Sequence, residues 1–144
     1  SMGAATVLMA GSMELPENVV GIIADCGYTS AKAIICKVIR DMKLPPKLCY
    51  PFVKLGARLF GHFDLDETSP LEAMRKCKLP VIFFHGEEDD FVPCAMSREN
   101  FEACSGKKQL VTIPGAGHGL SYAVQPAYYV QQLRDFFGPE GSCP

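Results

Sequence analysis

The chain has 144 residues, of which 48% are hydrophobic and 21% charged, and this composition is typical of one globular domain with a real core. The formal net charge is −2 and the lysines and arginines are scattered, so the sequence has no basic face for nucleic acid. It also has no stretch as long and apolar as a membrane span and no signal-peptide pattern, which favours a cytoplasmic protein unless an upstream segment directs it elsewhere.

The first third of the chain predicts a helix, a strand and a second helix. Residues 2–13 are apolar nearly all round, as expected of a buried helix, and small residues allow it to approach a sheet closely. The continuous apolar run at 19–26 is typical of a parallel strand covered on both faces. Thr29 and Ser30 can cap a following helix at 31–42, whose apolar residues recur at helical spacing.

The segment 44–68 differs from its surroundings in being rich in proline and in large apolar side chains. Two interpretations stay open, a lid or cap inserted over a binding site and a plain connecting helix packed on the core. After it, Ser69, Pro70 and Glu72 form a capping-box pattern that predicts the start of another helix.

The rest of the chain alternates strands with helices. We expect buried strands at 79–84 and 109–113, with a helix at 93–104 between them. A last helix should begin at Pro126 and end near Gly138. The order strand, helix, strand, helix predicts an α/β fold with a parallel sheet and flanking helices, whose ligand sites lie beyond the carboxyl ends of the strands.

The cysteines favour a reducing compartment. Their number is odd and no pair has the Cys-x-x-Cys spacing, so we expect neither a disulfide framework nor a metal site. Most follow apolar segments, where a free cysteine behaves as a small hydrophobic residue. The seven cysteines are Cys26, Cys36, Cys49, Cys77, Cys94, Cys104 and Cys143.

Three polar motifs follow the predicted strands or begin the chain. Ser1-Met2-Gly3 matches the second half of a Gly-x-Ser-x-Gly nucleophile elbow. The loop after the strand at 79–84 carries Asp89, and the glycine-rich turn after the strand at 109–113 carries His118. A serine hydroxyl becomes a nucleophile when an imidazole takes its proton and a carboxylate orients that imidazole. We therefore expect these three side chains to meet at one edge of the sheet.

These motifs together resemble the carboxyl-terminal half of a bacterial α/β-hydrolase of the serine esterase and peptidase-like group. The segments that carry the resemblance are Ser1–Ala10, Ala24–Ser30, His85–Pro93 and Gly115–His118. The resemblance implies one partial α/β-hydrolase domain over 1–144. Compared with the family, the sequence lacks the amino-terminal strands, the glycine before Ser1 and the loop that supplies half of an oxyanion hole.

The resemblance also implies a reaction. Ser1 would be the nucleophile, His118 the base and then the acid, and Asp89 the carboxylate that orients His118. The backbone amide of Met2 would be one oxyanion donor, and neither a metal ion nor an organic cofactor would be needed. The implied substrate is a small molecule with a carboxylic ester or related acyl bond; the sequence does not separate esters from thioesters, lactones or peptides.

Some assignments have rivals. Asp25 ends the first predicted strand and is the alternative acid, whereas His62 and His85 are interpreted as structural. Ser1 followed by Met2 also matches the remnant of a removed purification tag. The free amine of Ser1 would suit an amino-terminal nucleophile hydrolase, but that fold needs antiparallel layers.

Two expectations concern the chain as a whole. Three strands make only the edge of a larger sheet, so we expect self-association or pairing with the missing amino-terminal half, and little or no activity from this chain alone. A non-catalytic binding module on the same fold is the alternative to a hydrolase.

Overall fold

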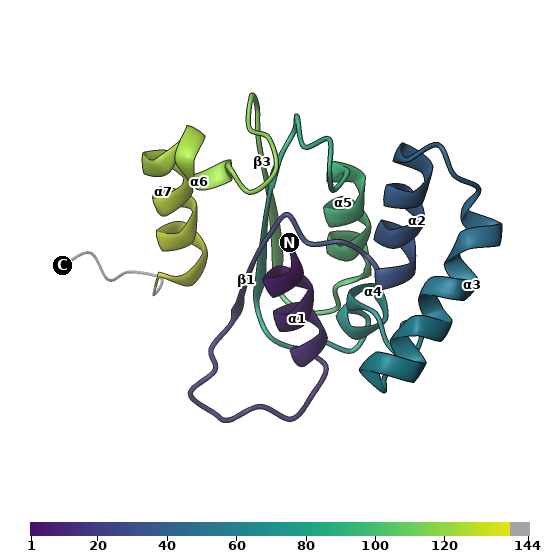
Figure 1. Ribbon diagram of the computed structural model, residues 1–144. Coiled ribbons are helices and arrows are strands. Elements are labelled where there is room, and N and C mark those ends of the chain that lie inside the picture. The colour runs from purple at the N-terminus through teal and green to yellow at the C-terminus, as the bar shows by residue number, and fades with distance from the viewer. Residues whose placement is uncertain (139–144) are drawn as a thin grey trace.

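Three parallel strands form the centre of the structure. The computed structural model describes residues 1–138, and its strands β1 (Ile22–Asp25), β2 (Val81–Gly86) and β3 (Lys108–Ile113) lie side by side in that order. Val81 is paired with Ile22 on one side and with Lys108 on the other. The predicted parallel α/β architecture is confirmed (Figure 1).

The predicted helices are present with small changes in their bounds, while the π-helix at 57–61 and the short helix at 121–124 were not predicted. They are α1 (Met2–Ala10), α2 (Ala31–Asp41), α3 (Pro46–Gly56), the π-helix η1 (Ala57–Gly61), α4 (Pro70–Met74), α5 (Cys94–Ala103), α6 (Ser121–Val124) and α7 (Pro126–Phe137). Ser30 caps α2 by accepting a hydrogen bond from the amide of Ala33, as the sequence predicts. Ser69 caps α4 through the amide of Glu72, while the Glu72 carboxylate pairs with Arg75.

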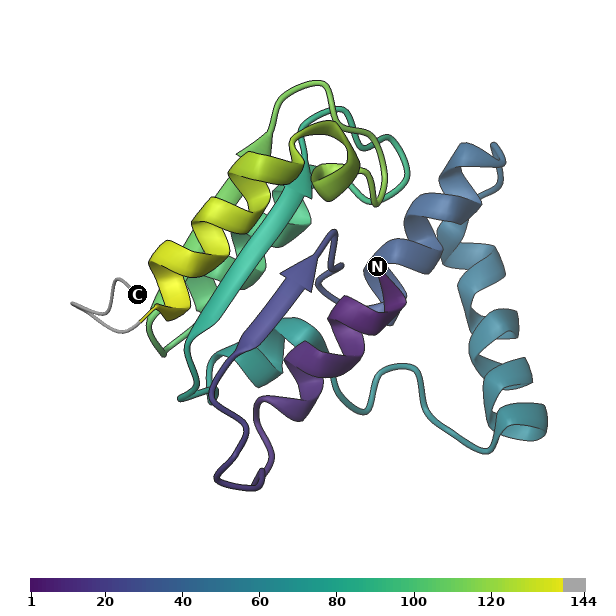
Figure 2. The same ribbon diagram turned by 90° about the vertical axis from the view of Figure 1, so that its left-hand side faces the viewer.

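Strand β2 is buried on both faces because its side chains alternate between two helical layers. Val81 and Phe83 belong to a core shared with α1, α4 and α5, and Ile82 and Phe84 belong to a second core under α7. Figures 1 and 2 show α7 on one side of the sheet and α1 and α5 on the other. This burial places the carboxyl end of β2, and the loop that follows it, in the middle of the fold.

Strand β1 is shorter and more exposed than the sequence predicts. The expected strand at 19–26, covered on both faces, is confined to four residues. Ile22 and Ala24 are buried, but Ile23 on the other face is 46% exposed. Figure 2 shows why: α7 lies over β2 and β3 and leaves β1 uncovered. Because β1 pairs with β2 only, its other edge has no strand partner within residues 1–138.

The segment 44–68 lies to one side of the sheet layers. Helix α3 packs against α2, and neither sheet core includes a residue of this segment. Tyr50 is its buried anchor and donates a hydrogen bond of 2.7 Å to Asp66. Many large apolar side chains here stay exposed, and the lid function remains a prediction. The most exposed are Leu48, Phe52, Leu59, Phe60 and Phe63.

Within the described residues, no helix combines the length and the apolar character that crossing a membrane requires.

The end of β2 leaves no room for a side chain at Gly86. A Cβ atom there would lie 2.1 Å from the backbone oxygen of Ala116 and 2.7 Å from that of Gly117. We expect Gly86→Ala to lower the free energy of unfolding by about 1 to 3 kcal/mol, because backbone must shift to admit the methyl group. Urea denaturation measures the change.

Gly56→Ala is the matched control, because a Cβ atom at this helical position meets nothing within 4 Å. It should leave the stability unchanged or raise it slightly, since alanine favours a helix more than glycine does. Equal stability of the two variants would contradict the close contact between β2 and the turn that carries His118.

Candidate active site

Asp89 is held in one orientation by the backbone of its own loop. The loop follows β2, and Asp89 Oδ1 accepts hydrogen bonds from the amides of Phe91 at 3.0 Å and Val92 at 2.8 Å. The Asp89 side chain is fully buried. Because both bonds use Oδ1, the second carboxylate oxygen remains available to other donors.

That second oxygen, Asp89 Oδ2, lies 2.8 Å from His118 Nδ1. His118 is in the turn after β3, where Gly115 and Gly119 take positive φ angles of 74° and 69° that side chains rarely tolerate. A carboxylate only accepts hydrogen bonds, so the Nδ1–H of His118 donates, and in the neutral ring Nε2 keeps its lone pair. The side chain of His118 is 31% exposed, so this lone pair belongs to a ring that reaches the surface.

His85 supports the acid loop from the interior. Its ring is fully buried, and its Nε2 lies 2.8 Å from the carbonyl oxygen of Val92 and 3.2 Å from Asp89 Oδ2. Two acceptors facing Nε2 require a proton on that nitrogen. The hydroxyl of Ser97, 2.6 Å from Nδ1, then donates to the other nitrogen. These contacts agree with the interpretation of His85 as a structural residue.

Ser1 lies close to this pair but is not bonded to it. It precedes α1, and Met2 is the first residue of that helix, so the amide of Met2 has no acceptor within the helix. The amino end of Ser1 lies beside the thiol of Cys26. The Cys26 sulfur in turn lies within 4.8 Å of donor atoms of both Asp89 and His118. Ser1 Oγ makes no hydrogen bond to His118 in the described part of the chain.

Asp25, the alternative acid, binds other partners. It ends β1 and accepts a hydrogen bond of 2.8 Å from the hydroxyl of Ser121. Burial raises the pKa of the nearby Tyr129 hydroxyl, and the Asp25 charge raises it further. Of the two candidate carboxylates, Asp89 is therefore the one bonded to His118. His62, the third histidine, follows η1, on the 44–68 segment.

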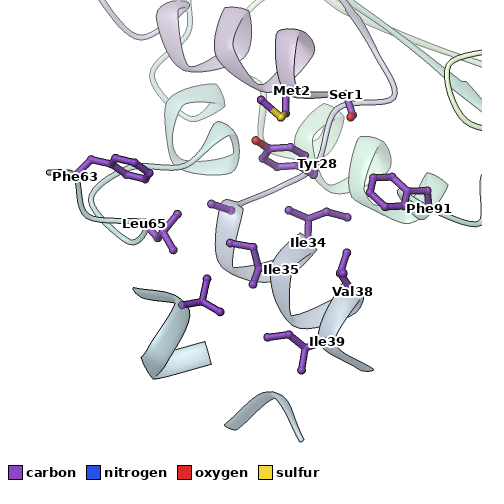
Figure 3. A pocket seen from close by; sticks show the side chains of 12 residues that line it. Ser1, Met2, Tyr28, Ile34, Ile35, Val38, Ile39, Phe63, Leu65 and Phe91 are labelled. Atoms are coloured by element: carbon purple, nitrogen blue, oxygen red, sulfur yellow. The ribbon is translucent and has the colours of Figure 1, made fainter. Parts of the chain in front are cut away.

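A cavity of about 670 Å³ opens beside Ser1. Ser1, Tyr28 and Phe91 line its end near the candidate triad (Figure 3). Its remaining walls are apolar and come from the start of α1, from one face of α2 and from the 44–68 segment. They are Met2, Ala31, Ile34, Ile35, Val38, Ile39, Val53, Phe63 and Leu65.

Sequence reasoning missed several residues around the site. Ser97, Ser121 and Tyr129 carry no motif, and only their contacts across the fold show that they hold His85 and Asp25. Cys26 was interpreted as a small hydrophobic residue, and burial does raise the pKa of its thiol. One signal for Cys26 was available, because it directly follows Asp25 at the end of a predicted strand. All six cysteines in residues 1–138 are free, and Cys143 lies outside the described residues.

The chain is similar in sequence to parts of two longer bacterial proteins, while no family model matches it. It is 27% identical over 137 residues to protein YqkD of Bacillus subtilis, an alignment that covers 94% of this chain and 45% of YqkD. It is 32% identical over 64 residues to a bifunctional esterase/perhydrolase of Acinetobacter calcoaceticus, covering 42% of this chain and 23% of that enzyme. The chain thus spans less than half the length of either relative.

Solved structures resemble the chain over most of its length. An esterase of Pyrococcus furiosus superposes with a TM-score of 0.66 at 23% identity, over 94% of this chain and 50% of the esterase. A puromycin-hydrolysing peptidase of Mycobacterium tuberculosis gives a TM-score of 0.65 at 22% identity, over 92% and 20%. An α/β-hydrolase enzyme from a deep-sea metagenome of the Medee basin gives 0.63 at 14%, over 100% and 65%. The chain therefore has a part of the α/β-hydrolase fold.

Proposed function

We propose that this chain belongs to a serine hydrolase that cleaves carboxylic esters or related acyl bonds, with Ser1, Asp89 and His118 as its triad. The observation that carries the proposal is the 2.8 Å hydrogen bond between Asp89 and His118. It leaves Nε2 of a half-exposed imidazole free to accept a proton. The esterase and peptidase among the structural relatives support a hydrolytic use of this fold.

The proposed reaction proceeds through an acyl-enzyme. His118 Nε2 takes the proton of Ser1 Oγ as the oxygen attacks the carbonyl carbon, and then gives it to the leaving alcohol. Asp89 stabilises the imidazolium that forms in between. Water, activated by the same imidazole, hydrolyses the acyl-serine. The amide of Met2 is suited to donate to the oxyanion, and we expect a second donor from the remainder of a longer protein.

The cavity suggests the kind of acyl group. Its walls beside Ser1 are aliphatic and aromatic, and it offers few polar groups that would recognise a charged substrate. We propose that a small to medium apolar acyl chain lies along α2, with its carbonyl carbon at Ser1. The 44–68 segment then acts as a lid, because its residues Val53, Phe63 and Leu65 line the same cavity as α2.

The exposed edge of β1 supports a proposal about assembly. Ile23 is 46% exposed and Val20 is 74% exposed beside an edge that has no strand partner in the described chain. We propose that this edge pairs with a further strand, from the missing amino-terminal half or from a second copy, and that the 144-residue chain alone has little activity. Six free cysteines fit a reducing, cytoplasmic location.

The first prediction from the proposed function separates the two candidate acids. In neutral His118 the proton should reside on Nδ1, because Asp89 accepts it. Asp89→Asn should shift this proton toward Nε2, since the amide no longer stabilises the original tautomer. Asp25→Asn is the matched control and should leave the tautomer unchanged. Long-range proton–nitrogen NMR correlations measure the tautomer of His118. A tautomer that changes in Asp25→Asn and not in Asp89→Asn would make Asp25 the orienting carboxylate.

The second prediction concerns the nucleophile. A fluorophosphonate probe should label Ser1 of the complete gene product, as mapped by peptide mass spectrometry, and Ser1→Ala should abolish labelling. His118→Asn should slow labelling about 10³-fold or more, because the hydroxyl loses its base. His62→Asn is the matched control, since asparagine tolerates the left-handed backbone at this position. Folded protein that the probe does not label would instead favour a non-catalytic binding module.

The third prediction concerns the acyl chain. Val38→Trp should fill part of the cavity along α2 and lower kcat/KM for an octanoyl ester about tenfold relative to an acetyl ester. Val130→Trp, on α7 at the opposite side of the sheet, is the control and should leave this ratio unchanged. Kinetics of the complete gene product with a series of p-nitrophenyl esters measures both variants. An equal loss for all chain lengths in Val38→Trp would place the acyl group elsewhere.

A further inference from the structure

Cys26 is the one member of the site's central cluster for which the hydrolase reaction has no use. Its sulfur, a carboxylate oxygen of Asp89 and a ring nitrogen of His118 all lie within 4.8 Å of one another. The residue is 2% exposed and directly follows β1, with a left-handed φ of 50°. The fold thus brings together a thiol, an imidazole and a carboxylate from three loops at the same sheet edge.

These three donor types are the ones that divalent zinc prefers. Zinc binds thiolate sulfur, imidazole nitrogen and carboxylate oxygen, and sites with three protein ligands keep a fourth position open. The three donor atoms are a soft sulfur, a nitrogen and only one oxygen. This combination disfavours magnesium and calcium, because both ions prefer oxygen ligands. The chemistry of the donors therefore points to a zinc-like ion.

The charges around the cluster favour a cation. Burial raises the pKa of the Cys26 thiol, and the negative charges of the nearby Asp25 and Asp89 carboxylates raise it further. Among residues 1–138, no lysine or arginine forms an ion pair with either carboxylate.

The carboxylate and the imidazole are also held in place before any ion arrives. Two backbone amides and His85 orient Asp89, and the glycine turn after β3 positions His118. Such outer contacts fix the direction of ligands and strengthen metal binding. The ring of His118, with 31% of its side chain exposed, gives an ion a route from solvent.

We propose that Cys26, Asp89 and His118 form a binding site for Zn²⁺ or a similar divalent ion. On binding, the Cys26 thiol releases its proton to solvent, and the proton of the neutral His118 ring moves from Nδ1 to Nε2. Cys26 Sγ, Asp89 Oδ2 and His118 Nδ1 then coordinate the ion. His118 cannot ligate the ion and serve Ser1 as a base at once. The ion is therefore an inhibitor of the proposed hydrolase rather than its cofactor, and this second step rests on the proposed function.

Cobalt(II) tests the site without any assay of activity. The reduced 144-residue chain, titrated with Co²⁺, should show visible bands of four-coordinate cobalt and a near-ultraviolet band from a thiolate–cobalt bond, and one equivalent of Zn²⁺ should remove them. Cys26→Ser should lose the near-ultraviolet band. His118→Ala should weaken binding about tenfold or more. Cys36→Ser, a cysteine on α2, is the matched control and should bind as the unmodified chain does.

Several results would overturn the site. These are no cobalt band even at a large molar excess, a band that persists in Cys26→Ser, or one that disappears in Cys36→Ser. Circular dichroism checks the fold of every variant. If Cys26→Ser does not fold, His118→Ala decides, because unchanged cobalt affinity in that folded variant contradicts the site.

Inhibition has its own readout. Zn²⁺ should slow fluorophosphonate labelling of the complete gene product, and much less so in Cys26→Ser. Equal slowing in both proteins would contradict inhibition through this site. If the metal-free protein is never labelled while cobalt still binds, the hydrolase proposal fails and the metal site stands.

Discussion

The hydrogen bond between Asp89 and His118 depends on how β2 ends. All six residues of β2 are buried, so the strand has little freedom to shift, and the loop after it starts from a fixed point. Gly86 then brings the backbone of that loop against the turn that carries His118. With Phe91 and Val92 donating to one oxygen of Asp89, the other oxygen can only face the imidazole. Packing thus determines the geometry on which any chemistry here relies.

Local patterns predicted the parts of this arrangement that depend on local causes. The apolar run at 79–84 indicated a strand buried on both sides, and Ser30 indicated a helix start, because each needs only its own neighbours in the sequence. The exposure of Ile23 could not be predicted in this way. Its strand is as apolar as β2, and what uncovers it is the position of α7, which lies over the other two strands.

The choice between Asp25 and Asp89 shows the same limit. Both carboxylates follow buried parallel strands, so both are expected at the same edge of the sheet, and sequence spacing does not rank them. The hydroxyl of Ser121, far along the chain, donates a hydrogen bond to Asp25 and so ties β1 to the segment after His118. Asp25 thereby contributes to holding the imidazole loop, although its carboxylate is not bonded to the ring.

Cys26 has two physical roles that depend on what surrounds its sulfur. Burial raises the pKa of the thiol, so without a metal ion it stays neutral and packs like a small apolar side chain, as its sequence context suggests. A coordinated ion would stabilise the thiolate and reverse that preference. The three ligands are separated by 63 and 29 residues and therefore leave no spacing motif in the sequence. Only the convergence of three strand ends can create such a site, and the same convergence places it on the base that Ser1 would need.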